Sequence, residues 1–345
     1  MQGRESSQSQ LFGTAPIESL IPQDHPLKKI RALCDEAMNP LDSAWETQYS
    51  DVGKPGIPPQ VLLRALLLQA LYSIKSERAL CEQIEFNVLF RWFVGLDWDD
   101  QVFDHSTLSK NRGRLLADGA AQAFLGQVVR LAKSRHLLSS DRLVVDGTLV
   151  KAWASMKSFK AKDGSEDDKT NFKGTKRSNE THQSKSDPDA RLFRKGKGQE
   201  SMLCHMGHIV VDGVSGIIRA CRVTHATGKA EVEAALAMLE EHAEPGSTAV
   251  ADRFYDQGPF VKGCRRLGVR AHPRQKSRGS RLDGRTTKRP SYEVSMKTRY
   301  IVERAFGWVK GSGRMRQTVF RGTEKVESQF HIYCIAHNLR RMATA

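Results

Sequence analysis

Apolar positions recur at helical spacing through the first part of the chain. Leu27, Ile30 and Leu33 follow the spacing of a helix that buries one face. Residues 61–71 are apolar nearly all round, which is typical of a helix at the centre of a bundle. Further helical patterns follow, and the first clear strand pattern starts only at residue 142. We therefore predict an all-helical domain over residues 1–138.

The second part of the chain has short β-branched runs that alternate with amphipathic helices. The expected elements are a strand at 142–150, a polar insertion at about 155–201, strands at 204–211 and 217–224, a helix at 229–242, a strand at 248–251, a helix at 259–267, a strand at 269–272, a basic loop at about 273–291, and helices at 299–310 and 324–342. This is the element order of an RNase H-like α/β domain, a mixed sheet with flanking helices. We expect it to occupy residues 139–345, preceded by the helical domain.

The composition constrains the partner. The chain has 54 Lys and Arg against 39 Asp and Glu, a formal net charge of +15, and a pI near 9.7. Such a charge favours a polyanion, and double-stranded DNA is the usual one, although charge can also serve solubility alone. It disfavours a two-carboxylate glycosidase, whose sugar substrate is neutral.

The sequence also indicates the compartment. The six cysteines are scattered without Cys-x-x-Cys spacing, so neither a zinc site nor a disulfide framework is indicated. The first residues are polar, and no apolar run approaches the length of a membrane span. We expect a protein of the cytoplasm without membrane contact.

Three carboxylates are candidates for a metal centre. Asp146 and Asp252 each follow a β-branched run, and Glu303 lies on the helix predicted at 299–310. A charge at the end of an apolar run costs stability unless something compensates it. Because carboxylates suit hard divalent ions, we expect Mg²⁺, with Mn²⁺ as a substitute, as two ions that support in-line phosphoryl transfer. A hairpin turn at Asp146 and Gly147 is the structural alternative.

The helix at 299–310 places a carboxylate between two cations. At about 100° per residue, Arg299, Glu303 and Lys310 fall within an arc of roughly 40°, beside an apolar strip that includes Phe306. The carboxylate is therefore expected at the rim of a buried face. An ordinary solvated ion pair between Arg299 and Glu303 is the alternative.

Other basic or aromatic side chains are candidate DNA contacts. A helix that starts near residue 104 carries cations in its first turns, either to dock on a duplex or as a solvated basic face. The loop at 273–291 is expected to follow DNA or to be a solvated loop, and the insertion is expected to be mobile unless DNA orders it. Tyr255 could stack on an unpaired base. These candidates are Lys110, Arg112, Arg114, Arg253, Tyr255, Arg278, Arg281 and Arg285.

Eight short motifs follow one another along the chain. They are Tyr72-Ser-Ile-Lys-Ser-Glu-Arg, Phe90-Arg-Trp-Phe-Val-Gly-Leu, His105-Ser-Thr-Leu-Ser-Lys-Asn-Arg, Val145-Asp-Gly-Thr-Leu, Ser186-Asp-Pro-Asp-Ala-Arg-Leu, Ala251-Asp-Arg-Phe-Tyr-Asp, Asp283-Gly-Arg-Thr-Thr, and Arg299-x3-Glu-x6-Lys. Each is weak alone. Together and in this order, they resemble the bacterial insertion-sequence DDE transposases of the IS-five/IS-four superfamily over essentially the whole chain.

The resemblance implies that Asp146, Asp252 and Glu303 form the DDE triad, while Arg299 and Lys310 contact DNA phosphates. One position departs: the family often has a tyrosine three places before the arginine, where this chain has Met296. The implied function is recognition of terminal inverted repeats, cleavage at the ends and joining of 3′-hydroxyls to target DNA, by a homodimer. A nuclease without strand transfer and an inactive remnant or DNA-binding regulator are the alternatives.

Overall fold

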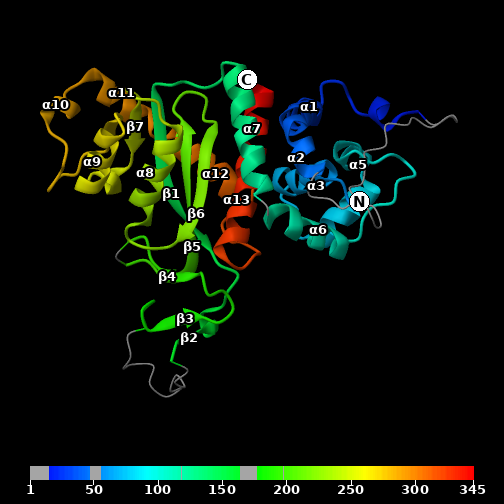
Figure 1. Ribbon diagram of the computed structural model, residues 1–345, viewed down its shortest axis with the longest axis horizontal. Helices are drawn as coiled ribbons and strands as arrows, with labels where there is room; N and C mark the ends of the chain where they lie inside the picture. The colour runs from blue at the N-terminus through cyan, green and yellow to red at the C-terminus, as the bar shows by residue number, and fades with distance from the viewer. Residues whose placement is uncertain (1–14, 47–55, 118, 164–176, 197) are drawn as a thin grey trace. The chain divides into compact units, whose positions relative to one another are not determined.

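The computed structural model describes residues 15–46, 56–117, 119–163, 177–196 and 198–345. The chain divides into two compact units, the first made of Met1–Leu137 with Ile332–Ala345 and the second of Leu138–His331. Figure 1 shows the course of the chain through both.

The first unit is all-helical in its described part, as predicted. Its elements are η1 (Ile17–Leu20), α1 (Pro26–Met38), η2 (Asn39–Leu41), α2 (Asp42–Glu46), α3 (Pro59–Leu71), α4 (Glu77–Phe86), α5 (Val88–Val94), α6 (His105–Ala117) and α7 (Ala120–Ser134). As its all-round apolar pattern predicts, α3 is buried along almost its whole length. The one buried charge on it, Arg64, pairs with Asp35 at 2.8 Å, which compensates for its burial.

Local chemistry sets the helix ends in this unit. The Ser76 hydroxyl accepts a hydrogen bond from the Ala79 amide at 3.1 Å at the start of α4, and the Asn87 side chain accepts one from the Phe90 amide at 3.3 Å at the start of α5. Gly95 ends α5 in the left-handed conformation, with φ of 93°. These caps explain two short helices whose lengths alone would not make them stable.

The second unit is built on a mixed sheet. Its strands are β1 (Arg142–Lys151), β4 (Arg191–Phe193), β5 (Met202–Asp212), β6 (Ile218–His225), β7 (Thr248–Ala251) and β8 (Arg270–Pro273). They lie in the order β4-β5-β1-β7-β8, with β6 also paired to β5. β1 is antiparallel to β5 and parallel to β7, so the two strands that lead to the aspartates are hydrogen-bonded neighbours. The sheet is the predicted RNase H-like arrangement.

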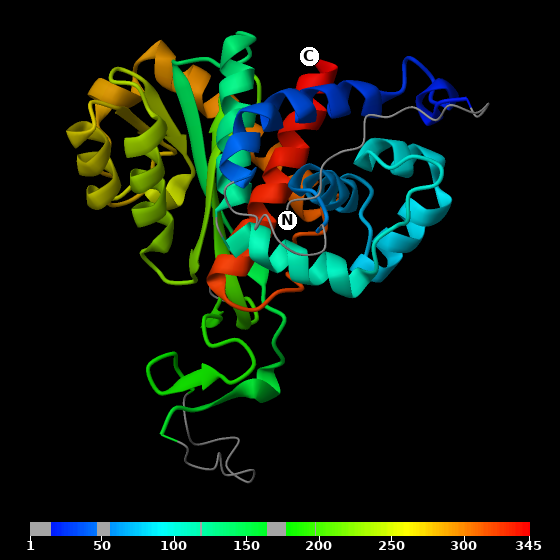
Figure 2. The ribbon, with the colours of Figure 1, turned by 45° about the vertical axis from the view of Figure 1, so that its right-hand side comes forward.

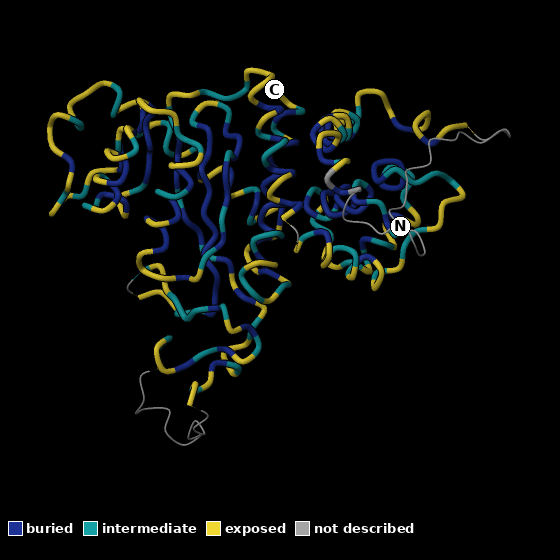
Figure 3. Tube along the Cα trace, viewed as in Figure 1, coloured by how far each residue is buried: buried dark blue, intermediate teal, exposed yellow. Residues whose placement is uncertain are grey.

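Helices cover both faces of this sheet. α8 (Ala230–His242) and α9 (Gly258–Arg266) share a buried core with Leu143 and Val145 of β1. Because strand residues alternate between faces, Thr148 of β1 lies on the opposite face, where it meets Lys310 of α12 (Ile301–Lys310). The start of α13 (Thr323–Thr344) covers that face too, since a side chain at Gly207 of β5 would meet Phe330 at 3.0 Å. The sheet strands are accordingly buried along most of their length, as Figure 3 shows.

The polar insertion is only partly a loop. Its described residues form η3 (Met156–Ser158) and a small sheet of β2 (Phe159–Ala161) and β3 (His182–Ser184), seen beyond β4 in Figures 1 and 2. Phe159 and Leu203 bury a small core of their own. The prediction of an unstructured insertion is therefore wrong for these residues, because a few apolar side chains suffice once β5 supplies a surface. Residues 164–176 and 197 lie outside the described part.

Two details near the predicted site differ from the sequence-based expectation. Asp146 lies in the middle of β1 and Gly147 pairs with His208, so the hairpin-turn alternative is wrong. The helix expected at 299–310 is α12, which begins at Ile301, and a further helix that was not predicted, α11 (Pro290–Thr298), precedes it, with Arg299 and Tyr300 between the two. The remaining elements, η4 (Arg253–Tyr255) and α10 (Gly284–Thr287), are short, and α10 lies within the segment predicted as a basic loop.

Candidate active site

The two aspartates lie where β1 extends beyond the end of its parallel neighbour, β7. β7 pairs with β1 only at Arg142, Leu143 and Val144, whereas β1 continues to residue 151. The same parallel register carries Asp146 to the level of Asp252, which directly follows β7. Both carboxylates are thereby placed where β1 has no hydrogen-bonded neighbour on that side.

The backbone at Gly147 shows which groups occupy this open edge. The N–H and C=O of one strand residue point to the same edge of the strand. Here the Gly147 N–H donates to Asp146 Oδ1 at 2.8 Å, and the Gly147 carbonyl accepts from Lys195 Nζ at 2.8 Å. A carboxylate and an ammonium group thus take the place of a neighbouring strand.

Electrostatics set Asp146 apart from an ordinary surface acid. Burial raises the pKa of Asp146 to about 6, and the charge of Asp252 adds to the rise. Lys195, the Gly147 N–H and Arg299 act in the opposite direction. The negative charge of Asp146 is therefore only partly compensated by the groups around it.

Glu303 reaches the site region from α12. Its side chain is 55% exposed and lies 3.4 Å from Arg299 Nη1, so the ion pair named as an alternative does form. Lys310 donates from Nζ to the Thr148 hydroxyl at 3.0 Å. Glu303, Lys310, Thr148 and Lys195 line one cavity of about 750 Å³. Burial and the neighbouring cations Lys195 and Arg316 lower the pKa of Lys310.

The structure does not gather the three expected metal ligands into one group. In the described part of the chain, no three acidic, His or Cys side chains lie close enough together to hold a metal ion. Asp146 and Asp252 influence each other electrostatically, while Glu303 faces Arg299. Like charges repel unless a cation lies between them, so the separate pairing of Glu303 has a clear physical reason.

Two charged residues of the site were missed by sequence reasoning. Glu231, on α8, is 7% exposed, and burial raises its pKa to about 7, with contributions from Asp146 and Asp252. Lys195 lies 3.6 Å from Glu231 Oε1. A signal existed for Glu231, because it shares the buried face of its helix with Ala235 and Met238. None existed for Lys195, which lies in the polar insertion.

Tyr255 does not have the predicted position. It is 1% exposed, and its ring lies 5.1 Å from that of Phe260 and 6.0 Å from that of Phe254. The expected stacking on an unpaired base is therefore wrong, since the apolar core covers the ring. Arg253, two residues earlier, is exposed.

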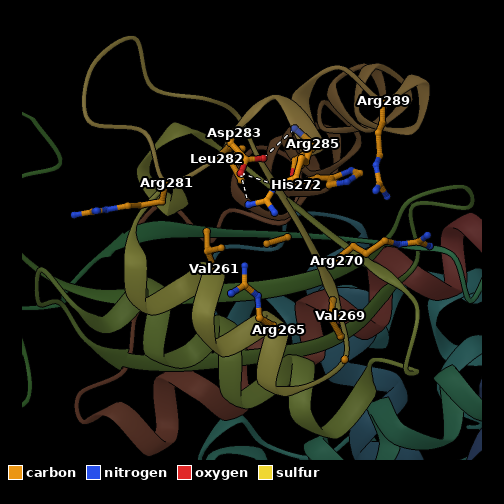
Figure 4. A pocket seen from close by; sticks show the side chains of 13 residues that line it. Val261, Arg265, Val269, Arg270, His272, Arg281, Leu282, Asp283, Arg285 and Arg289 are labelled. Carbon is orange, nitrogen blue, oxygen red and sulfur yellow. Dashed lines mark hydrogen bonds and ion pairs between the residues drawn. The ribbon is translucent and has the colours of Figure 1, made fainter.

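The basic loop is ordered and lines a second cavity. Asp256 accepts hydrogen bonds from the Lys276 and Arg281 amides, both at 2.8 Å, so the loop is held to the core and is not a free solvated segment. Arg281 and Arg285 line a cavity of about 580 Å³ beside β8 and α9 (Figure 4). Three further arginines line it, namely Arg265, Arg270 and Arg289. Arg278 is exposed on the same loop.

The three cations of α6 differ in their exposure. Lys110 and Arg114 are exposed. Arg112 is 14% exposed and pairs with Glu77 of α4, and burial lowers its pKa to about 10. The prediction that Arg112 contacts DNA is therefore wrong for this conformation, because its charge is used to join two helices.

Comparison with known proteins identifies the family. Residues 15–114 match the model of a transposase domain (DUF772), and residues 139–339 match that of a transposase DDE domain. No curated protein matches the chain in sequence. None of the helices in the described part of the chain is long and apolar enough to cross a membrane.

Solved structures with related architecture are remote. A piggyBac transposase synaptic complex with hairpin DNA is 10% identical with a TM-score of 0.42, covering 95% of this chain and 77% of that one. A Mos1 transposase paired-end complex is 10% identical with a TM-score of 0.19, covering 66% and 64%. These scores are too low to support an argument about the site. The family is instead identified by the transposase DDE domain, whose model matches more than half of the sequence. The chain belongs to the DDE transposases and is a DNA-cleaving enzyme of that class.

Proposed function

We propose that this transposase binds the terminal inverted repeats of its own insertion sequence, cleaves at their edges and joins the freed 3′-hydroxyls to target DNA. The observation that carries the proposal is the register that sets Asp146 level with Asp252 at the open edge of β1. Glu303 lies in the neighbouring cavity with Lys310 and Lys195. Cations beside a carboxylate site suit a substrate whose backbone is anionic.

Asp146, Asp252 and Glu303 would hold divalent metal, as Mg²⁺ or Mn²⁺ and as two ions. The residues present fit such ions, because carboxylate oxygens are their preferred ligands and the charge of Asp146 is only partly compensated. Glu303 is exposed enough to turn from Arg299 toward the aspartates. When bound, the ions make the attacking hydroxyl more acidic and stabilise the leaving oxygen.

The chemistry is in-line substitution at phosphorus. In cleavage, the oxygen of water bonds to phosphorus, the bond from phosphorus to the 3′-oxygen breaks, and the proton of the water is taken up as the 3′-hydroxyl forms. In joining, that 3′-hydroxyl loses its proton and attacks a target phosphate, whose own 3′-oxygen leaves. Lys310, fixed by Thr148, and Arg299 would hold the non-bridging phosphate oxygens during both steps.

Contacts outside the centre would position the DNA. Lys110 and Arg114 of α6 are exposed cations for end recognition, and Arg253 is exposed next to Asp252. The arginine-lined cavity beside β8 would hold a further stretch of backbone. Because two ends must be cut in concert, we expect a homodimer on DNA that works in the bacterial cytoplasm.

The test compares wild type with Glu303→Gln on a labelled duplex that carries the element's terminal repeat and its flank, in Mg²⁺ or Mn²⁺. Glu293→Gln is a matched control, because Glu293 forms an exposed i, i+4 ion pair with Lys297, as Arg299 does with Glu303. We expect cutting at the repeat edge and joining to a second duplex, both lost in Glu303→Gln and kept in the control.

Other results would select another function. Cutting without joining would identify a nuclease with this fold. Binding of the repeat with neither reaction would identify an inactive remnant or a DNA-binding regulator. Full activity of Glu303→Gln would remove Glu303 from the triad.

A further inference from the structure

A carboxylate from the opposite face of the sheet also reaches the open edge of β1. Glu303 approaches from α12, on the face that Thr148 shares with Lys310. Glu231 belongs to α8, which packs on the other face together with Leu143 and Val145. At the middle of a sheet these two faces are separated by the strands. At an edge without a neighbouring strand, side chains from both faces can meet.

Gly147 makes this approach possible. A Cβ atom at this position would lie 2.8 Å from both Cγ and Oε1 of Glu231, which is closer than real contacts allow. Any other residue would displace the Glu231 side chain from the strand. Gly147 directly follows Asp146, so the glycine admits the Glu231 carboxylate next to the first catalytic aspartate.

A buried hydroxyl faces the same group of acids. Tyr255 is 1% exposed, and among the residues that the structure describes none forms a hydrogen bond with its Oη atom. Burial raises the pKa of Tyr255, and the charges of Asp146, Glu231 and Asp252 raise it further. The hydroxyl is therefore an unused polar group beside three carboxylates, which indicates that a ligand or water belongs there.

Simpler roles do not account for Glu231. An acid in the first turn of a helix normally stabilises the positive end of its dipole, which favours the charged form. Burial and two neighbouring acids oppose that form here. A structural ion pair is the other simple role, and Lys195 does lie 3.6 Å from Glu231, but it also donates a hydrogen bond to the Gly147 carbonyl at 2.8 Å and lowers the pKa of Asp146. Lys195 thus compensates the group of acids, not Glu231 alone.

We propose that Glu231 is a fourth carboxylate of the cation-binding centre, acting with Asp146 and Asp252, and that Lys195 competes with the bound cation for the same negative charge. The inference rests on the proposed metal-dependent function and adds a residue from α8 to it. Its ligand class is a divalent cation, and Mn²⁺ is the probe.

The experiment measures Mn²⁺ binding to the purified full chain by electron paramagnetic resonance of the free ion. Glu231→Gln should weaken binding by about tenfold or more, as should Asp146→Asn. Glu233→Gln is the matched control, because Glu233 is an exposed acid of the same helix and loses the same charge. It should bind as wild type does. Thermal melts in EDTA show whether each variant is folded.

Lys195→Met gives an independent result if Glu231→Gln does not fold. It keeps every carboxylate and removes the competing charge, so Mn²⁺ binding should tighten several-fold. Wild-type affinity in folded Glu231→Gln, beside weakened affinity in Asp146→Asn, would overturn the inference while leaving the proposed function intact. Unchanged affinity in Lys195→Met would also overturn it. Unchanged affinity in Asp146→Asn would instead refute the metal centre itself.

Discussion

Fully or partly buried carboxylates occur in two kinds of surroundings in the second unit. Asp212 is fully buried, accepts hydrogen bonds from the Ser139, Val214 and Ser215 amides at 2.8 to 3.0 Å, and pairs with Arg219 at 2.7 Å. Asp146 accepts one backbone hydrogen bond, from its neighbouring residue. Burial alone therefore does not mark a functional acid. The number of donors that the protein supplies separates a carboxylate that holds a loop from one that can bind a cation.

The same distinction divides the motifs that carry the family resemblance. In the segment at 186–192, Asp187 lies 2.9 Å from His205 and accepts from the Gly322 amide at 3.1 Å, while Asp189 accepts from the Thr323 amide at 2.9 Å. These acids join the insertion to β5 and to the start of α13. The motif around Asp146 has no such set of donors. One motif is structural and the other is suited to catalysis.

The largest expected effect is on catalysis. Asp146→Asn should lower cleavage of the repeat duplex by about 10³-fold or more, because it removes a proposed metal ligand. Asp141→Asn is the control, since Asp141 is an exposed acid just before the same strand. Cleavage should be followed in single-turnover assays. Comparable losses in both variants would mean that Asp146 has no special role.

The next effect is on the free energy of unfolding, when a buried acid with a full set of hydrogen-bond donors is changed. Asp212→Asn should lower the free energy of unfolding by about 3 kcal/mol, because it leaves the largely buried Arg219, whose side chain is 10% exposed, without its charged partner. Glu241→Gln, which breaks an exposed pair with Arg222, should cost less than about 1 kcal/mol. Urea unfolding measures both. An Asp212→Asn protein as stable as wild type would contradict the comparison.

The pH dependence of stability should distinguish the two kinds of acid. Asp146 has a pKa of about 6 against 3.8 for the free side chain, so the folded protein holds its proton more tightly. Its contribution to stability is complete below about pH 3.8 and is lost as the pH rises through 6. In EDTA, wild type should therefore lose about 2 kcal/mol relative to Asp146→Asn between pH 4 and pH 7.

Urea unfolding at intervals of one pH unit measures this difference. The other charged groups that interact with Asp146 include Lys195, Asp252, Arg299, Glu231 and Lys310, and all of them are kept in the variant. Parallel curves for the two proteins would show that burial does not disfavour the Asp146 charge.

The smallest effect is on DNA binding by the basic loop, which Asp256 holds in place through backbone hydrogen bonds. Asp256 binds the backbone of Arg281 and leaves its guanidinium beside the cavity that Arg285 also lines. Each of Arg281→Gln and Arg285→Gln should reduce the slope of log K against log salt for DNA binding by about 1. Lys297→Gln, on an exposed and already paired lysine, should leave it unchanged. Equal slopes in all variants would exclude this cavity as a phosphate contact.

Most elements of both units follow from local patterns in the sequence. Periodicity predicts α1, α3, α8 and every strand of the six-stranded sheet except β4 within a few residues, because amphipathic spacing and β-branching act locally. The structure of the insertion and the helix α11 were not predictable in this way. The small sheet at Phe159 depends on a surface supplied by Leu203, far along the chain.

The sequence by itself determined the family and the candidate triad, because both rest on short motifs in a fixed order. Only the tertiary structure decided which charged residues are near one another. It placed Glu231 and Lys195 at the open edge of β1 and removed Tyr255 and Arg112 from the DNA contacts. The reason is that exposure and charge compensation arise from the packing of distant elements, which no local pattern records.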